Sequence, residues 1–352
     1  MTIANPPSPQ FSPAPSSPQS AMRLRELIFG AACAAAVRAA ASLEVADALG
    51  EEPMTVEDLA KAVHAEPGPL RRLLRTLTCY GVFTDAGEDR YAHTDMSWQL
   101  RKESPNSLHY IALWCTEPWT WQLWPHLDEA VRTGRNIFPD VYGKEFFTYL
   151  HEDATASAEV FDKAMTHSSR QSAADLVGFL NLEGITSVVD IGGGQGHVLA
   201  SLLEKHPEIH GTLIDLPQVI ARADPRLHEA GTLSPRARLI ATDCRTEVPV
   251  QADLYIIKNI LEWDTDSTRR TLRNVVEAAP PGARVVVVEN LVDDTPSMRF
   301  TTAMDLLLLL NVGGAKHSRA SLQTLLTEAG LRVDEVRPVN PYLHAFECVV
   351  PG

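Results

Sequence analysis

The feature that most constrains the fold of this chain is a glycine-rich turn between an apolar run and a helical pattern. Residues 188–191 read Val-Val-Asp-Ile, and Gly192-Gly193-Gly194-Gln195-Gly196 follow directly before a helical pattern over 198–204. Glycine lets the backbone approach a ligand closely, and such turns lie at the carboxyl end of the first strand of a parallel sheet. The segment therefore predicts a strand, a ligand-binding turn and a helix.

Apolar runs alternate with helical patterns from residue 187 onward. The runs cover residues 187–191, 211–215, 254–258 and 283–289. Strands that are buried on both faces read as continuous apolar runs, as in parallel sheets covered by helices. The second half of the chain, beginning near Leu176, is therefore predicted to be an α/β domain with a mostly parallel sheet.

The residues around the turn exclude two kinds of phosphate ligand and favour another cofactor. A dinucleotide fingerprint fails because its last position falls on His197 or Leu199, and no Gly-Lys-Ser/Thr follows for a P-loop. Instead, acids end three successive strands at Asp190, Asp215 and Asp243. A carboxylate at the second strand end can accept both ribose hydroxyls. A cationic nucleoside without phosphates fits this set, and S-adenosyl-L-methionine is that ligand.

The N-terminal half is organised differently. Residues 1–20 are rich in proline and serine and are predicted to be a disordered tail, because they bury too little apolar surface to offset their ordering entropy. A helical pattern with small side chains follows over 22–49, which allows close packing, including packing against a second subunit. Residues 55–101 then give two helices, separated by Pro67-Gly68-Pro69, and a hairpin with its turn at Gly87, the pattern of a winged helix.

A winged helix suggests DNA binding as an alternative, with Arg71, Arg72 and Arg75 as the contacts. Between residues 55 and 101, however, six basic side chains stand against seven acidic ones, and the whole chain has a formal net charge of -14. Nucleic-acid affinity comes mainly from clustered Lys and Arg. We therefore predict no nucleic-acid partner, and tight binding in a low-salt gel shift would revive the alternative.

The cysteines and the apolar runs indicate where in the cell the protein is expected to lie. The five cysteines are scattered without a C-x-x-C pair, which favours a reducing cytoplasmic location and predicts no metal site. The apolar run over 28–37 is too short to span a bilayer, so no membrane partner is expected.

An aromatic helical region lies between the two halves, over residues 106–175. Trp114, Trp119, Trp121 and Trp124 fall within eleven residues of it. Such clusters form cores, and they also line pockets for flat ligands. We therefore expect this region to link the halves and to contribute to a substrate pocket.

Several segments occur together in one known family. They are Leu70-Arg71-Arg72-Leu73-Leu74-Arg75, Gly81-Val82-Phe83, the glycine turn, Ile214-Asp215-Leu216-Pro217, and Pro280-Pro281-Gly282 before Val288-Glu289. Over residues 22–350 the chain resembles the S-adenosylmethionine-dependent O-methyltransferases of plant phenolic and bacterial natural-product pathways. The resemblance implies a Rossmann-like domain over 176–352 with a mostly parallel seven-stranded sheet. It also implies a helical winged-helix dimerisation domain over 21–105, and hence a homodimer.

The motifs and the resemblance together assign ligand contacts. The cofactor residues are expected to be Asp190, Gly192, Gly193, Gly194, Asp215, Leu216, Asp243, Cys244, Lys258 and Trp263, the last of which would shield the cofactor. A substrate pocket is expected from Trp114, Trp121, Met165, His167, Leu308 and Asn311.

The chain departs from the family at the catalytic base. Where the family carries His-Asp-Trp-Asp-Asp, with the histidine as base, residues 262–266 read Glu-Trp-Asp-Thr-Asp, so Glu262 replaces the histidine. Glu289 matches a family carboxylate that orients the histidine, but Lys316 replaces another acid. A carboxylate of pKa about 4.3 is a poor base for a phenol of pKa about 10. Burial beside Glu289 would make Glu262 a stronger base and pairing with Lys316 a weaker one, and the sequence leaves both open.

Other arrangements would meet the need for a base. His317, beside Lys316, and His167 are alternative bases, so that Glu262, Glu289 and His317 are the catalytic candidates. An acceptor that is already acidic, such as a hydroxyquinone, an ortho-acyl phenol or a carboxylate, needs only positioning.

The predicted activity is methyl transfer to a small aromatic metabolite, with a hydroxyl oxygen as the acceptor. Methylation of a ring carbon beside a phenol is one alternative, because ring attack tolerates a changed base arrangement. Another is a repurposed family member, a hydroxylase, decarboxylase or pericyclase that keeps the cofactor without methyl transfer.

Overall fold

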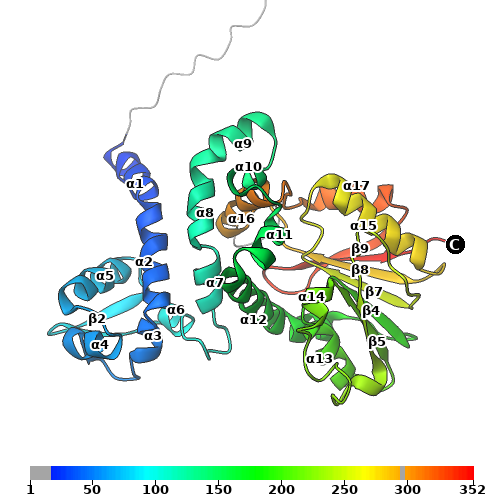
Figure 1. The fold of residues 1–352 in the computed structure, drawn as a ribbon, viewed down its shortest axis with the longest axis horizontal. Coiled ribbons are helices and arrows are strands. Elements are labelled where there is room, and N and C mark those ends of the chain that lie inside the picture. Colours follow the sequence, from blue (N-terminus) through cyan, green and yellow to red (C-terminus); the bar gives the residue numbers. More distant parts are fainter. Residues whose placement is uncertain (1–16, 294–297) are drawn as a thin grey trace, which may run out of the picture. The chain divides into compact units, whose positions relative to one another are not determined.

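A computed structural model describes residues 17–293 and 298–352 of the chain (Figure 1). The described residues form two compact units, one up to residue 101 and the other from residue 102 onward. The predicted tail lies almost wholly outside the described residues. Helix α1 nevertheless begins at Pro18, so the expectation of a tail to residue 20 is wrong for its last residues. The side chain of Ser17 accepts a hydrogen bond from the Ser20 N–H at 3.0 Å and so caps this helix.

The first unit is a winged helix preceded by helices. Its elements are α1 (Pro18–Ile28), α2 (Gly30–Ser42), α3 (Val45–Ala48), β1 (Met54–Thr55), α4 (Val56–Ala62), α5 (Pro67–Cys79), β2 (Phe83–Gly87), β3 (Arg90–His93) and α6 (Asp95–Trp98). The three strands form an antiparallel sheet in the order β1-β3-β2. The predicted two helices and hairpin are all present.

Two local expectations in this unit need correction. The sequence predicts that Pro67-Gly68-Pro69 separates the helices, but α5 begins at Pro67, because proline suits a first turn whose N–H groups lack helical partners. The hairpin turn lies at Glu88 and Asp89, both in the left-handed region, rather than at Gly87. Arg71, a DNA-contact candidate, pairs instead with Glu57 at 2.8 Å and Asp89 at 3.0 Å.

The second unit begins with helices. They are α7 (His109–Trp114), α8 (Pro118–Leu123), η1 (Trp124–His126), α9 (Leu127–Thr133), α10 (Phe138–Tyr142), α11 (Phe146–Glu152) and α12 (Thr155–Phe179). The domain boundary expected near Leu176 falls inside α12, because no helix breaker precedes it and Leu176 is buried in the core. No helix among the described residues is both long enough and apolar enough to cross a membrane.

The remainder of the second unit is built around a sheet of seven strands. Its elements are β4 (Ser187–Ile191), α13 (His197–Lys205), β5 (His210–Asp215), α14 (Pro217–Ile220), η2 (Ser234–Arg236), β6 (Ala237–Ala241), β7 (Leu254–Lys258), α15 (Thr265–Ala278), β8 (Arg284–Glu289), α16 (Met298–Asn311), α17 (Arg319–Glu328), β9 (Arg332–Pro338) and β10 (His344–Val349). The strand order is β6-β5-β4-β7-β8-β10-β9. Only β10 runs antiparallel to its neighbours, which confirms the predicted mostly parallel sheet.

Helices cover both faces of this sheet (Figure 1). Alternate residues of β4 point to opposite faces: Val188 belongs to the core beneath α12 and α13, and Val189 to the core beneath α15 and α17. Burial on both faces explains the continuous apolar runs in the sequence. The strand order places the carboxyl ends of β6, β5, β4 and β7 side by side, and the site lies at this edge.

Candidate active site

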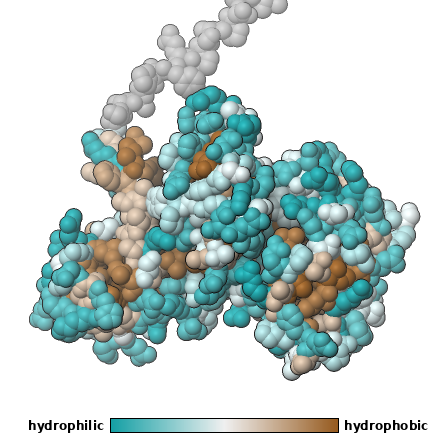
Figure 2. All heavy atoms as spheres, viewed as in Figure 1, coloured by the Kyte–Doolittle hydropathy of each residue, from teal (hydrophilic) through white to brown (hydrophobic). Residues whose placement is uncertain are grey.

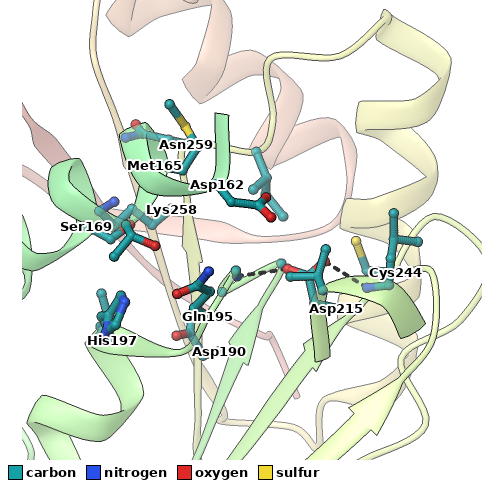
Figure 3. A pocket seen from close by; sticks show the side chains of 18 of the residues that line it. Asp162, Met165, Ser169, Asp190, Gln195, His197, Asp215, Cys244, Lys258 and Asn259 are labelled. Carbon is teal, nitrogen blue, oxygen red and sulfur yellow. Dashed lines mark hydrogen bonds between the residues drawn. The ribbon is translucent and has the colours of Figure 1, made fainter. Parts of the chain in front are cut away.

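A pocket lies at the carboxyl ends of β4, β5 and β7, beside the loop after β6, and residues of α11 and α12 complete its wall (Figure 3). Every residue predicted to contact the cofactor lines it: Asp190, Gly192, Gly193, Gly194, Asp215, Leu216, Asp243, Cys244, Lys258 and Trp263. The carboxyl ends of neighbouring parallel strands meet at one edge of a sheet, so motifs distant in sequence converge here.

The turn requires glycine because of the backbone angle at one position and because of lack of space at another. Gly194 has a φ of +61°, which favours glycine, although a Cβ added there would meet nothing within 4 Å. At Gly193 an added Cβ would lie 2.4 Å from Asp190 Cγ and 2.6 Å from Leu213 Cδ1. The Gly194 N–H donates to Asp215 Oδ2 at 2.8 Å. The turn is thus held against β5 and leaves open space on its pocket side.

Asp190 and Asp215 lie along this turn, and both have pKa values well above the usual range. Burial raises the pKa of Asp190 to about 7, opposed by the nearby Lys258 charge and assisted by Asp215. Burial likewise raises the pKa of Asp215 to about 6, although the N–H groups of Leu216 and Gly194 hydrogen bond to it. The Oδ2 atom of Asp190 has no hydrogen-bond partner among the described residues. A nearby positive charge would favour the ionised form of both carboxylates, so this part of the pocket is suited to a positively charged ligand.

The other end of the pocket combines an ion pair with an aromatic ring. Burial opposes ionisation of Asp243, but hydrogen bonds from Arg245 outweigh it and the pKa of Asp243 lies below its ordinary value. The Arg245 guanidinium also lies 5.3 Å from the centre of the Trp263 ring. Asp243 and Trp263 are thereby fixed near Cys244, which is buried. This wall offers a flat apolar surface with hydrogen-bonding groups at its edge.

A second cluster of charges, Glu262, Glu289 and Lys316, lies near Lys258 but does not line the pocket. Lys316 Nζ forms an ion pair with Glu262 Oε1, and both side chains are largely buried. Burial and the neighbouring Glu262 carboxylate raise the pKa of Glu289 well above its ordinary value. Burial lowers the pKa of Lys258, against the attraction of Asp190 and Glu289. The raised pKa favours the protonated form of Glu289, while Lys316 pairs with Glu262.

His317 has a structural contact rather than a place on the pocket wall. Its Nε2 lies 2.6 Å from the Leu261 carbonyl oxygen and donates to it, and its own carbonyl accepts from the Val292 N–H at 3.0 Å. Gly314 in the same loop is packed against Glu262, since an added Cβ would lie 1.7 Å from the Glu262 carbonyl oxygen. These contacts hold the loop that carries Lys316 against the segment that carries Glu262.

The predicted substrate residues are not gathered in the pocket, with one exception. Met165 lines it, whereas His167 on the same helix packs edge-on against Tyr110, with ring centres 5.2 Å apart. Trp114 is buried against Phe161, and Trp121 donates to the Thr116 carbonyl at 3.0 Å. Leu308 and Asn311 lie on α16 and do not line this pocket.

Sequence reasoning missed several residues of the wall, which are Phe147, His151, Phe161, Asp162 and His197. The first four come from α11 and α12, whose helical pattern gives no sign of which face meets the sheet edge. His197 carried a signal: it directly follows the glycine turn, at the amino end of α13.

Comparisons with known proteins agree with this architecture. A model of the O-methyltransferase domain matches residues 124–332, and a model of the O-methyltransferase dimerisation domain matches residues 25–103. The chain belongs to the O-methyltransferase family. This O-methyltransferase is 36% identical to mitomycin biosynthesis 6-O-methyltransferase of Streptomyces lavendulae, over 92% of this chain and 94% of that protein.

Solved structures of similar proteins support the same family. The mitomycin 7-O-methyltransferase MmcR superimposes with a TM-score of 0.84 at 34% identity, covering 94% of this chain and 98% of that one. The neocarzinostatin O-methyltransferase NcsB1, solved with S-adenosylmethionine and 2-hydroxy-5-methyl naphthoic acid, has a TM-score of 0.74 at 30% identity, covering 91% of this chain and 96% of that one. The O-methyltransferase described here uses S-adenosylmethionine. Its pocket fits that cofactor, since Asp190, whose Oδ2 lacks a hydrogen-bond partner within the described part of the chain, and the open space beside Gly194 suit a cationic ligand.

Proposed function

We propose that this enzyme methylates a hydroxyl oxygen of a small aromatic molecule. The observation that carries the proposal is one pocket lined both by Asp190 and Asp215, whose pKa values burial raises, and by the aromatic side chains Phe147 and Phe161 of α11 and α12. Apolar and aromatic walls suit a flat acceptor ring. The resembling NcsB1 structure, with its naphthoic acid, supports an aromatic acceptor.

We assign the cofactor contacts by the position of each group along the pocket. Asp215, whose oxygens each accept one backbone N–H, keeps further lone pairs for the ribose hydroxyls. Cys244, Trp263 and the Asp243–Arg245 pair take the base, and Leu216 lies beside them. Asp190 and the backbone of the turn receive the charged amino-acid end, with Lys258 beside Asp190. When bound, the cofactor supplies an electrophilic methyl group on a positively charged sulfur.

The charged cluster decides which acceptors suit the enzyme. Protonation of Glu262 would break its ion pair and leave the buried Lys316 ammonium without its counter-charge, which is costly. We therefore propose an acceptor whose hydroxyl is acidic by its own structure, such as a hydroxyquinone or an ortho-acyl phenol, so that the paired Glu262 suffices as the proton acceptor that the reaction still needs. Met165 contributes to the acceptor wall, and His317 holds the loop rather than acting as base.

The direct test uses methyl-labelled S-adenosylmethionine with a panel of phenols graded in acidity. We expect S-adenosylhomocysteine to form in proportion to methylated product, fastest with the most acidic hydroxyls, and NMR of the product to place the label on oxygen. Label on ring carbon would support C-methylation instead. Substrate turnover without S-adenosylhomocysteine would support the repurposed alternative, and no turnover of any compound would contradict the proposal.

We also propose that two copies associate through the first unit and that the enzyme is cytoplasmic. The dimerisation model matches this unit, and α1 exposes large apolar side chains over more than half of their surface, which are Met22, Leu24, Leu27 and Ile28. Figure 2 shows apolar residues gathered along α1 and α2. The cytoplasmic location rests on the scattered cysteines of the sequence.

A further inference from the structure

The pocket wall contains a buried histidine that the proposed reaction does not use. His197, the first residue of α13, lines the pocket and is 5% exposed. Its Nδ1 lies 3.2 Å from Asp224 Oδ2, while its Nε2 has no hydrogen-bond partner among the described residues. A buried polar atom without a partner is costly, and one in a ligand pocket is a candidate ligand contact.

The partner of His197 is held rigidly in its charged form. Arg226 donates to Asp224 through its side chain, at 2.9 Å and 2.6 Å, and through its backbone N–H at 3.0 Å. These hydrogen bonds hold the pKa of Asp224 down to about 2. The Asp224 N–H in turn donates to the Gln195 carbonyl at 2.8 Å, which ties the pair to the glycine turn.

This arrangement fixes the protonation of the imidazole. An ionised Asp224 can only accept, so the proton of neutral His197 is assigned to Nδ1, and Nε2 keeps its lone pair. Burial lowers the pKa of His197, and the positive charges of Arg170 on α12 and Arg226 act in the same direction, against Asp224. The neutral form therefore prevails at neutral pH, and the buried Nε2 of this pocket-lining residue keeps an acceptor lone pair that no described residue uses.

The position of His197 along the pocket indicates which part of the cofactor would lie beside it. The base side of the pocket lies beyond β6 at Asp243 and Trp263, and the ribose carboxylate Asp215 ends β5. His197 lies past the turn after β4, and Figure 3 shows it on the side of Asp190, away from Asp215 and Cys244. A ligand that runs from β6 across β5 to β4 brings its amino-acid end here.

We propose that His197 Nε2 accepts a hydrogen bond from the α-ammonium group of the cofactor, alongside Asp190, and that Asp224 is its positioning residue. A lone pair accepts from an ammonium and repels a carboxylate, which distinguishes the two groups at this end of the ligand. The inference rests on the proposed placement of S-adenosylmethionine. It predicts that protonation of His197 weakens cofactor binding, because Nε2 then loses its lone pair and adds a positive charge.

The test measures binding by the full-length protein of two compounds, S-adenosylhomocysteine, which keeps the amino-acid end, and 5′-methylthioadenosine, which lacks it. We expect His197→Ala to weaken S-adenosylhomocysteine binding about tenfold, the effect of one hydrogen bond to a charged group, and to leave 5′-methylthioadenosine binding unchanged. His197→Gln keeps an acceptor oxygen without titrating, and should restore most of the affinity. His206→Ala is the matched control, because His206 ends the same helix and pairs with Glu208.

The pH dependence of S-adenosylhomocysteine binding distinguishes the contribution of His197 from that of Asp190, whose carboxyl group also titrates. Binding of S-adenosylhomocysteine by the wild type should weaken as pH falls through the lowered pKa of His197. The His197→Gln variant should lack this decrease in affinity but should keep the decrease caused by protonation of Asp190. Equal losses for both compounds, or none for either, would overturn the inference. Failure of the wild type to bind S-adenosylhomocysteine would instead overturn the cofactor placement on which it rests.

Discussion

Glu262 and Lys316 form a buried ion pair. With Trp263 aligned to the tryptophan of the family's His-Asp-Trp-Asp-Asp, Leu261 stands at the histidine position and Glu262 at the acid that follows it, so the expectation that Glu262 replaces the histidine is wrong by one residue. Their charges compensate each other inside the fold, where both side chains of the Glu262–Lys316 pair are largely buried. Breaking a buried pair from one side leaves an uncompensated charge, which costs about 3–5 kcal/mol. A substitution of Glu262 therefore affects its ion pair as well as its proposed role as proton acceptor.

The first prediction separates these functions. Glu262→Gln should abolish turnover, lower the free energy of unfolding through the stranded Lys316 charge, and change cofactor affinity little, because Glu262 does not line the pocket. The double variant Glu262→Gln/Lys316→Met should regain stability but not turnover, as measured by denaturant unfolding and product formation. An unaltered rate in either variant would show that no proton acceptor at this position is needed.

The second prediction concerns Asp190. Its pKa of about 7 in the free enzyme means that it is largely protonated below pH 7, and a bound ammonium favours its ionised form. Cofactor binding should therefore release a proton below pH 7, and affinity should fall as pH decreases there. Calorimetry in buffers of different ionisation enthalpy measures the release, which Asp190→Asn should reduce. A proton uptake that is the same in both proteins would contradict this assignment.

The third prediction concerns Asp215. Asp215→Ala should weaken cofactor binding by about 1–3 kcal/mol, through the loss of charged hydrogen bonds to the ribose and of the acceptor for the Gly194 N–H. Asp128→Ala, which removes only an exposed ion pair with Arg132, should bind the cofactor as the wild type does. Titration calorimetry compares the two, and retained affinity in Asp215→Ala would exclude the ribose role.

At the scale of elements, short loops between strands and helices set the positions of the reactive groups. The loop that carries Lys316 approaches the segment after β7 so closely that only glycine fits at position 314. An isolated bridge between Leu291 and His317 and the His317–Leu261 hydrogen bond hold the same loop in register with the strand ends. The ion pair at the site thus depends on backbone packing several residues away.

This packing gives the fourth prediction. Gly314→Ala should displace the loop, because its Cβ would overlap a backbone oxygen, and should reduce the rate of methyl transfer far more than cofactor affinity. Gly178→Ala in α12, where an added Cβ meets nothing within 4 Å, serves as the control and should stabilise the fold by about 0.5–1 kcal/mol. Comparing kcat with the cofactor dissociation constant tests this, and equal kcat for the two variants would contradict it.

At the scale of the whole molecule, each unit buries a core of its own, but the first unit leaves apolar surface uncovered on α1. Isolated apolar residues are common on protein surfaces, whereas a contiguous set along one helix marks an interaction site. A second copy of the chain is the partner that the dimerisation model of this unit suggests.

The fifth prediction tests this association. Leu27→Glu combined with Ile28→Glu should shift the protein from dimer to monomer in sedimentation experiments, because charges replace apolar side chains that are 63% and 68% exposed. Val131→Glu, at an equally exposed apolar residue on α9 of the second unit, should leave the dimer intact. A monomeric wild type would remove the basis for the proposed interface.

The sequence by itself determined the parallel sheet, the winged helix and the meeting of the glycine turn with the strand-end acids. These follow from local and periodic signals: glycines that need a left-handed backbone, apolar runs that need burial on both faces, and acids at strand ends that parallel topology must bring together. It did not determine whether Glu262 is a free carboxylate or a paired one, nor that Met165 reaches the pocket while His167 packs on Tyr110. Those outcomes depend on which helix faces and loops meet across long stretches of chain, and only the tertiary packing decides that.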